Sequence, residues 1–289
     1  MRRMNASVAS RYRGRLAPSP TGYLHLGHAQ TFWAAQQRAR ETGGELILRN
    51  DDLDRVRCKP EFVSAMLEDL RWFGLEWSEG PDCGGPSAPY NQSERTELYR
   101  AAFEKLKSGN FVYPCTCSRK EIQQSVSAPH AGDDEPIYPG TCREHPANPQ
   151  ITSGFSWRFR VPDGEAISFL DANCGPQKFI AGKDFGDFII WRPDDLPAYQ
   201  LACVVDDAAM QITEVVRGRD LLVSTARQIL IYRALALVPP EFFHCELLRD
   251  EQGQRLAKRS DSMGLRTLRD NGATPESLRK SLINLQIDK

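Results

Sequence analysis

The sequence contains no long apolar run and no marked excess of one charge. The apolar stretches Phe188 to Trp191 and Ile229 to Val238 are shorter than a membrane span, and Arg233 interrupts the second. We therefore expect no membrane insertion. Lysine and arginine number 37 against 38 acidic residues, so any contact with nucleic acid must come from a local basic surface.

A secretory signal and a disulfide framework are also missing. The first fifteen residues hold five arginines and no acid, as a targeting peptide does, but they lack an apolar core. The eight cysteines are scattered, and only Cys115 and Cys117 lie close together. A reducing cytoplasm is therefore the expected location. We also expect a monomer, because 289 residues can bury a sizeable core without a partner.

The first half of the sequence alternates strand and helix patterns, which favours an α/β fold with a doubly wound parallel sheet. Gly43 and Gly44 end the first helix and Gly74 ends the second, as C-terminal glycines commonly do. The predicted elements are a strand over Tyr12 to Ala17, helix His28 to Thr42, strand Glu45 to Arg49, helix Pro60 to Phe73 and helix Glu94 to Lys107.

This alternation breaks after residue 110, which indicates an insertion. Ser118 and Glu121 form a capping-box pattern, and residues 125–148 are rich in Pro, Gly, Asp and His. We expect the parallel pattern to resume near Asp187 to Trp191. The remaining predicted elements are strands Phe111 to Thr116, Trp157 to Val161, Ala166 to Leu170, Gln211 to Val216 and Cys245 to Leu248, and a helix over Ser224 to Leu237.

The tract His25-Leu26-Gly27-His28 follows the first strand and opens the first helix. Two imidazoles three positions apart face one side of a helix N-terminus, where the dipole and free N–H groups favour phosphate. Gly27 would let a nucleotide approach the backbone. The alternatives are two loop histidines without a role, or a zinc pair that lacks a nearby third ligand.

A second basic tract, Arg255-Leu256-Ala257-Lys258-Arg259-Ser260, follows the last predicted strand and a polar turn. Its charges could neutralise ATP phosphates as pyrophosphate leaves. Taken alone, such a run is usually a solvated loop. Its pairing with the distant His25 to His28 tract is the informative feature.

Together the two tracts resemble the HIGH and KMSKS motifs of class I aminoacyl-tRNA synthetases. Three further stretches are similar to the glutamyl and glutaminyl group of that class. They are Arg15 to Gly22, Pro197 to Asp207 and Glu214 to Asp220. The resemblance implies an ATP-dependent ligase with a Rossmann-type fold, split by a mixed α+β, zinc-containing insertion and ended by a helical stub.

The resemblance also implies a domain order. Residues 1–112 would form the first half of a nucleotide-binding domain and 113–186 an acceptor- and zinc-binding insertion. Residues 187–248 would form the second half, and 249–289 the KMSKS-like loop with the C-terminal stub.

Site residues follow from the same resemblance, position by position. Arginine forks suit the two carboxylates of glutamate, and a carboxylate suits its ammonium. The glutamate site would comprise Arg15, Ser19, Asp51, Tyr199 and Arg217. The catalytic residues would be His25, His28 and Lys258, and ATP with Mg²⁺ would contact His25, Gly27, His28, Arg255 and Lys258.

Three positions depart from the family pattern. Asp51 stands where glutamate is usual, so its carboxylate is one methylene shorter. Arg255 begins the basic tract, and Ala257 replaces a common serine, which removes a hydroxyl but keeps Lys258.

A third motif is Cys115-x-Cys117, followed by Tyr138-Pro-Gly-Thr-Cys142. Three thiolates and a phenolic oxygen can hold Zn²⁺, whereas strand cysteines alone are often just buried. The pattern resembles the zinc site of the shortened glutamyl-tRNA synthetase paralogues. His145 is a rival fourth ligand and His130 a weaker one.

Only 29 residues follow Ser260, too few for an anticodon-reading domain of ordinary size. In this the chain resembles the glutamyl-queuosine tRNA(Asp) synthetases, which esterify glutamate to queuosine at the anticodon of tRNA(Asp). RNA contacts could then come from basic and aromatic residues of the insertion, or these could form an ordinary mixed surface. They are Arg119, Lys120, Arg143, Trp157, Arg158 and Arg160.

Three other functions remain open at this point. The chain could be the catalytic core of an ordinary glutamyl- or glutaminyl-tRNA synthetase, which charges a tRNA 3′ end. It could be a cytidylyltransferase or pantothenate-type ligase, because those enzymes also use a His-x-x-His phosphate site. Their sequences, however, have no counterpart of the tract that contains Tyr199 and Arg217 here. It could also be a non-catalytic paralogue that binds RNA.

Overall fold

The computed structural model describes residues 11–118, 121, 137–144, 154–248 and 264–287. The chain divides into two compact units. The first unit comprises Met1–Tyr90, Gln211–Arg217 and Cys245–Lys289, and the second comprises Asn91–Met210 and Gly218–His244. No helix among the described residues is both long and apolar enough to span a bilayer.

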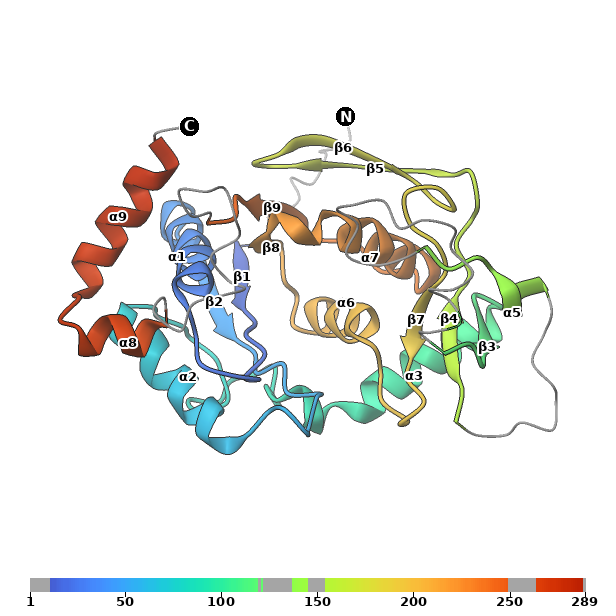
Figure 1. Cartoon of the computed structure of the whole chain (residues 1–289), viewed down its shortest axis with the longest axis horizontal. Helices are drawn as coiled ribbons and strands as arrows, with labels where there is room; N and C mark the ends of the chain where they lie inside the picture. The colour runs from blue at the N-terminus through green and yellow to red at the C-terminus, as the bar shows by residue number, and fades with distance from the viewer. Residues whose placement is uncertain (1–10, 119–120, 122–136, 145–153, 249–263, 288–289) are drawn as a thin grey trace, which may run out of the picture. The chain divides into compact units, whose positions relative to one another are not determined.

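The first unit is an α/β structure, shown at the left of Figure 1. The elements of the first unit are β1 (Arg13–Leu16), α1 (Leu26–Glu41), β2 (Glu45–Leu48), α2 (Pro60–Phe73), β8 (Glu214–Gly218), α8 (Leu265–Asp270) and α9 (Pro275–Ile287). The last residue of β8 falls in the second unit.

The strands of the first unit are built on β1. β2 pairs with β1 in parallel, from Arg13 opposite Glu45 to Leu16 opposite Leu48. On the other side, the Thr213 N–H that leads into β8 donates to the Arg13 carbonyl (2.8 Å). Leu16, Leu48 and Ile47 are completely buried. The parallel α/β class predicted from the sequence is therefore confirmed.

Helix α2 shows how local sequence sets these elements. Pro60 occupies its first turn, where a missing N–H loses no bond, and Gly74 ends it with a left-handed φ of 88°. The buried residues Ala65, Met66 and Leu70 recur at helical spacing. The bounds agree with the prediction residue for residue.

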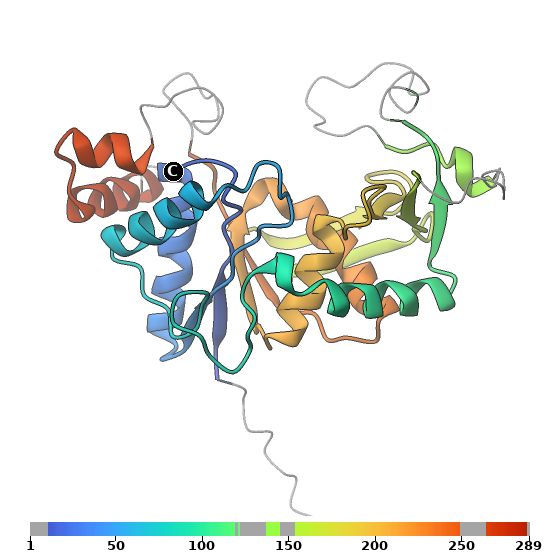
Figure 2. The ribbon, with the colours of Figure 1, turned by 90° about the horizontal axis from the view of Figure 1, so that it is seen from below.

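The second unit contains both antiparallel and parallel strand pairs, together with α-helices and short 3₁₀ turns. In Figures 1 and 2, α3 lies beside α6. The elements are η1 (Gln92–Glu94), α3 (Thr96–Ser108), β3 (Val112–Cys115), α5 (Thr141–Glu144), β4 (Ser156–Phe159), β5 (Ala166–Asp171), β6 (Gly175–Ile180), β7 (Phe188–Trp191), α6 (Tyr199–Ala209), η2 (Arg219–Leu221), α7 (Leu222–Ala234) and β9 (Glu241–Cys245).

Two strand predictions need correction. β7 was expected to resume the parallel sheet, but it pairs antiparallel with β4 in a sheet of order β3-β4-β7. The last strand, β9, ends at Cys245, where the prediction began. The first error arises because a short apolar run indicates a strand but not its partner or direction. The second is an error of bounds, which local sequence patterns define least well. The Ser118 and Glu121 capping box is confirmed by reciprocal bonds of 2.6 and 3.2 Å.

A buried ion pair in the second unit joins Arg95, at the start of α3, to Asp206 on α6. Asp206 on α6 is completely buried, and its Oδ1 accepts from Arg95 Nε at 2.7 Å. Gln92 Nε2 donates to Oδ2 at 2.7 Å, and the Tyr99 hydroxyl lies about equally near both oxygens. These donors satisfy a charge that would otherwise be strongly unfavourable in the interior.

Removing Asp206 should therefore destabilise the chain severely. We expect Asp206→Ala to lower the free energy of unfolding by about 3–5 kcal/mol, because the buried Arg95 guanidinium loses the carboxylate that it contacts at 2.7 Å and the Gln92 and Tyr99 side chains lose their acceptor. Urea unfolding followed by circular dichroism measures the change. Asp194→Ala is the control, because it breaks an exposed pair with Arg192 and should change stability by about 1 kcal/mol or less. Equal effects of the two substitutions would contradict the assignment.

Candidate functional site

Two histidines cap the N-terminus of α1. The backbone N–H of Gly27 donates to the ring Nδ1 of His25 (3.1 Å), and the backbone N–H of His25 donates to the ring Nδ1 of His28 (3.3 Å). Because each Nδ1 accepts a hydrogen bond, each neutral ring carries its proton on Nε2. The ring centroids are 3.8 Å apart. The positive end of the helix dipole therefore bears two adjacent N–H donors, a combination suited to phosphate.

His28 is held in its neutral form. Burial lowers its pKa to about 3, with a further lowering by the neighbouring His25. At neutral pH the side chain therefore acts as a hydrogen-bond donor through Nε2 and carries no charge.

Gly27 has a structural reason to be glycine. A Cβ at this position would lie 3.0 Å from both Cε1 and Nδ1 of His25. The sequence suggested that Gly27 makes room for a nucleotide. In the structure it first makes room for the His25 ring folded over the helix end.

The second basic tract lies outside the described residues, and with it Arg255 and Lys258. The described chain resumes at Gly264, which forms an antiparallel bridge with His25. The Leu265 N–H then donates to the Leu24 carbonyl (2.9 Å). Thus the chain four residues after Ser260 is bonded to the start of α1, which is the proximity that the pairing of the two motifs requires.

Helix α8 is held there by ionic contacts with α2. Arg266 lies 2.6 Å from Glu68 Oε2 and 3.3 Å from Asp69 Oδ1, and its guanidinium covers the Tyr23 ring. Leu265 is buried beside it. These contacts anchor the residues that follow the basic tract.

Three of the predicted glutamate residues lie near the carboxyl ends of adjacent strands. Arg15 is on β1, Arg217 on β8 and Asp51 three residues after β2, and all three are at most 7% exposed. Arg15 Nη1 donates to the Val216 carbonyl (3.1 Å), and the Asp51 N–H donates to Pro18 (3.0 Å). Ligands of parallel sheets commonly bind at this edge.

Asp51 has a partner that the sequence did not suggest. Arg49 is completely buried and donates to both carboxylate oxygens of Asp51, from Nε at 2.6 Å and from Nη2 at 3.2 Å. In the sequence, the feature that could have indicated this pair is the charged Arg49 directly after the apolar strand β2. The pair fixes the orientation of the Asp51 carboxylate, which has further lone pairs for another donor.

The other two predicted glutamate residues are more exposed. Ser19 lies exposed in the loop after β1, where its carbonyl accepts from the Thr21 N–H (2.8 Å). Tyr199 is the first residue of α6 in the second unit and is 42% exposed. Their roles stay predictions.

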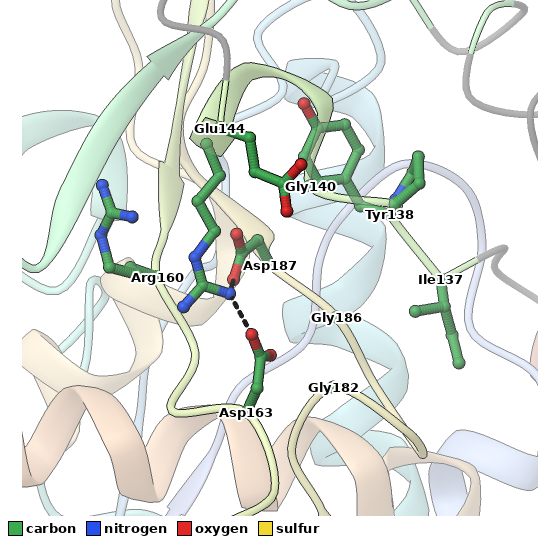
Figure 3. Close-up of a pocket in the computed structure, with 11 residues that line it drawn as sticks. Ile137, Tyr138, Gly140, Glu144, Arg160, Asp163, Gly182, Gly186 and Asp187 are labelled. Carbon is green, nitrogen blue, oxygen red and sulfur yellow. Dashed lines mark hydrogen bonds and ion pairs between the residues drawn. The ribbon is translucent and has the colours of Figure 1, made fainter.

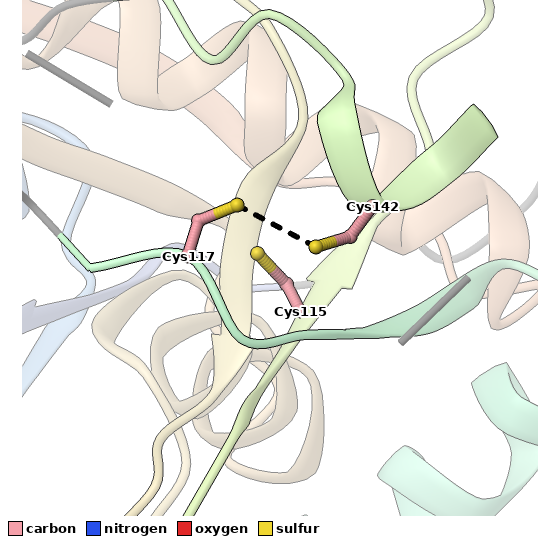
Figure 4. Close-up of side chains that lie close together, drawn as sticks. All are labelled: Cys115, Cys117 and Cys142. Atoms are coloured by element: carbon pink, nitrogen blue, oxygen red, sulfur yellow. Dashed lines mark hydrogen bonds between the residues drawn. The ribbon is translucent and has the colours of Figure 1, made fainter. Parts of the chain in front are cut away.

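The second unit brings the predicted metal ligands together. Figure 4 shows the side chains of Cys115, Cys117 and Cys142 pointing toward one another. Their Sγ atoms all lie within 4.8 Å of one another. The Tyr138 phenolic oxygen is 3.4 Å from Cys115 Sγ and 3.5 Å from Cys117 Sγ, and it accepts from the Cys142 N–H (2.8 Å). His130 and His145 lie outside the described residues.

The donor set fits zinc. A tetrahedral ion with Zn–S bonds of about 2.3 Å separates two sulfurs by about 3.8 Å, and Cys117 and Cys142 Sγ are 3.5 Å apart. Burial raises the pKa of Cys142, but hydrogen bonds from Thr116, Tyr138 and Cys117 outweigh it and lower that pKa to about 7. Burial raises the pKa of Cys117 to about 11.

The insertion residues predicted as RNA contacts are largely engaged within the fold. Arg158 is only 6% exposed and donates to Cys115 Sγ, so it is unsuited to contact RNA. Trp157 packs edge-on against Phe103 (5.4 Å between centroids). Arg143 pairs with Asp163 at 2.6 Å. Arg119 and Lys120 lie outside the described residues.

A pocket of about 450 Å³ is lined in part by Tyr138, which also packs against Cys115 and Cys142. Figure 3 shows the lining side chains. Arg143 and Arg160 line the pocket together with three acids, so its charge does not favour phosphate. The lining residues are Ile137, Tyr138, Pro139, Gly140, Arg143, Glu144, Arg160, Asp163, Gly182, Gly186 and Asp187.

Known proteins of one family are similar to this chain. Residues 11–288 match the family described as tRNA synthetases class I (E and Q), catalytic domain. The Glutamyl-Q tRNA(Asp) synthetase of Symbiobacterium thermophilum is 49% identical over 92% of this chain and 83% of its own. The Glutamate--tRNA ligase 2 of Nitrosococcus oceani is 42% identical, and the match covers 94% of this chain but 58% of that protein.

A solved structure agrees with this relationship. The glutamate tRNA ligase from Elizabethkingia meningosepticum, in complex with its amino acid, superposes with a TM-score of 0.81 at 28% identity. The match covers 94% of this chain and 60% of that one. Since the family match extends over nearly the whole sequence, the chain belongs to the class I tRNA synthetases (E and Q).

Proposed function

We propose that this protein activates L-glutamate with ATP and transfers the glutamyl group to queuosine at the anticodon of tRNA(Asp). The observation that carries the choice of acceptor is the level of similarity. Two proteins named Glutamyl-Q tRNA(Asp) synthetase are 49% and 47% identical, and the chain spans 83% and 82% of their lengths. The glutamate–tRNA ligase of N. oceani is less similar, at 42% over 58% of its length.

In the first step, an oxygen of the glutamate α-carboxylate attacks the α-phosphorus of ATP. The bond to the bridging oxygen breaks, and pyrophosphate leaves with its electron pair, which gives glutamyl-adenylate. His25 and His28 would donate from Nε2 to the phosphate oxygens, and Lys258 would neutralise the charge on the leaving group. Mg²⁺ bound with ATP would supply further charge neutralisation.

The glutamate would be held by the buried charges of the first unit. Arg15 and Arg217 each present a planar fork suited to one carboxylate of a dicarboxylic substrate. Asp51, oriented by Arg49, would accept from the α-ammonium. We propose that Ser19 and Tyr199 complete the amino-acid site.

In the second step, a hydroxyl of the queuosine cyclopentenediol attacks the carbonyl carbon of the adenylate. The ester forms, AMP leaves, and the hydroxyl proton is released. An alternative function is transfer to a tRNA 3′ end, which the similarity to solved glutamate tRNA ligases favours.

The first step can be tested by ATP–pyrophosphate exchange. We expect exchange that depends on glutamate, is not supported by glutamine or aspartate, and falls at least 100-fold in Lys258→Ala. Lys183→Ala in the second unit is a control for loss of a lysine. Absence of exchange with any amino acid, with or without tRNA, would overturn the enzyme assignment.

Radiolabelled glutamate identifies the acceptor. Label should appear in tRNA(Asp) that contains queuosine and not in the same tRNA without it. Label that survives in queuosine-free tRNA would favour the 3′-end alternative.

The neutral His28 makes stability depend on pH. Its pKa of about 3 lies below the unfolded value of 6.5, so the unfolded chain binds the extra proton between these values. Stability is thus unaffected above pH 6.5 and is lost as the pH falls. Lowering the pH from 7.5 to 5.5 should reduce the free energy of unfolding of the wild type. In His28→Gln, which lacks this titrating group, the same pH change should cause a reduction that is about 1.4 kcal/mol smaller. Urea titrations at the two pH values measure this, and identical losses would refute it.

We also propose that Cys115, Cys117, Tyr138 and Cys142 bind one structural zinc ion. The three thiols and the phenolic oxygen provide four donors in one cluster. A bound ion would link β3 to the α5 segment and hold the insertion in one conformation.

Metal content separates the possible fourth ligands. We expect one zinc per wild-type chain, loss of most of it in Tyr138→Phe, and full retention in His145→Ala. Elemental analysis after dialysis against a weak chelator gives the ratio. Complete retention by Tyr138→Phe together with loss in His145→Ala would assign the fourth position to the histidine.

A further inference from the structure

We infer that Arg158 is a positioning residue of the thiol cluster, where it orients Cys115 and Tyr138 and offsets their negative charge. This inference rests on the proposed zinc site. Its basis is the set of contacts that one buried guanidinium makes in the second unit.

Arg158 contacts two of the four proposed ligands. Its Nε donates to Cys115 Sγ at 3.2 Å, and its guanidinium carbon lies 3.8 Å from the centroid of the Tyr138 ring. The same group donates from Nη1 to the Asp187 carbonyl at 2.8 Å. The Arg158 guanidinium therefore makes three contacts at once: an N–H at its edge donates to the Cys115 sulfur, its flat face covers the Tyr138 ring, and another N–H donates to the Asp187 backbone carbonyl.

The β-sheet sets this position. Arg158 lies on β4, the middle strand of the β3-β4-β7 sheet, directly opposite Tyr113. Cys115 is two residues along β3 from Tyr113 and so shares its face of the sheet. The Tyr113 hydroxyl donates to Asp187 (2.5 Å), and Asp187 also accepts from the Val161 N–H (2.7 Å). The support of Arg158 is thus itself fixed by hydrogen bonds.

The charge of the cluster requires such a neighbour. Three thiolates and a phenolate carry four negative charges, and a zinc ion offsets two of them. The cluster is largely buried, where uncompensated charge is strongly unfavourable. Arg158, itself 6% exposed, brings a positive charge against this excess. Hydrogen bonds from outer groups to metal-bound ligands commonly change metal affinity 10- to 100-fold.

Lysine could not replace this side chain. A point charge on a flexible stem can approach the sulfur or the carbonyl, but it lacks the flat face that covers Tyr138. We therefore expect Arg158→Gln and Arg158→Lys each to weaken zinc binding 10- to 100-fold, with the stoichiometry kept. Arg160→Gln is the matched control: it lies two residues away and its guanidinium covers Tyr113 (4.9 Å) in place of Tyr138.

The test measures zinc affinity of the full chain by competition with a chromophoric chelator, and the cobalt-substituted spectrum, whose charge-transfer bands report thiolate coordination. The expected result is a weaker affinity and altered bands in both Arg158 variants, with wild-type values in Arg160→Gln. Thermal unfolding of the metal-free proteins shows which variants fold. If Arg158→Gln does not fold, the zinc affinity of Arg158→Lys tests the inference.

Two outcomes would overturn the inference, and they are distinguishable. Wild-type protein that binds zinc, with unchanged affinity and cobalt bands in the folded Arg158 variants, would reduce Arg158 to sheet packing and leave the zinc site intact. Wild-type protein that binds no zinc would remove the zinc site and this inference together. Glutamate-dependent exchange is measured separately and would report on the proposed activity in either case.

Discussion

The first unit depends on the hydrogen bonds that β1 makes to two distant segments. The Tyr12 carbonyl, which precedes β1, accepts from Glu45 (3.0 Å), and the Arg13 carbonyl accepts from Thr213 (2.8 Å). β1 and β2 are parallel, and parallel strands cannot be joined by a tight turn, so the chain between them must leave the sheet and return. The short connection contains α1, and the long one contains most of the second unit. This constraint places Arg15, Asp51 and Arg217 near the carboxyl ends of neighbouring strands.

Asp206 and Asp171, two buried carboxylates of the second unit, each have polar partners within that unit. Asp206 is satisfied by Arg95, Gln92 and Tyr99. Asp171 Oδ2 lies 2.5 Å from His244 Nδ1, and His244 Nε2 lies 3.0 Å from Thr225 Oγ1. This Asp-His-Thr chain resembles a catalytic triad in order, but all three side chains are buried, so its role is to support the fold.

The candidate site combines weak local signals with strong tertiary ones. His-x-x-His at a helix start is common enough to be uninformative alone. Its capping geometry fixes both protons on Nε2, and the bond from Leu265 to Leu24 attaches the chain that follows the basic tract next to the start of α1. In the same way, Cys-x-Cys alone indicates little. The approach of Tyr138 and Cys142 to those two sulfurs turns the pair into a four-donor cluster.

The sequence by itself determined the local elements and the residue types of the site. Helix α2 follows from its apolar spacing and from Pro60 and Gly74, and the Ser118 capping box from two side chains three positions apart. The family motifs likewise predict roles for His25, His28 and the arginines. Such features depend on neighbours within a few residues, which a sequence displays directly.

Only the tertiary structure decided which strands pair and which charges are buried. β7 pairs antiparallel with β4, and Arg49 donates to the Asp51 carboxylate. Arg158, which the sequence suggested as an RNA contact, donates to Cys115 Sγ in the thiol cluster. An apolar run has the same appearance in either strand direction, and an arginine has the same appearance at the surface or beside a thiol. Cys115 lies 43 residues from Arg158. Even Arg49 and Asp51, which are two residues apart, pair because the fold buries both side chains, so the energy that selects each arrangement is set by the folded chain as a whole.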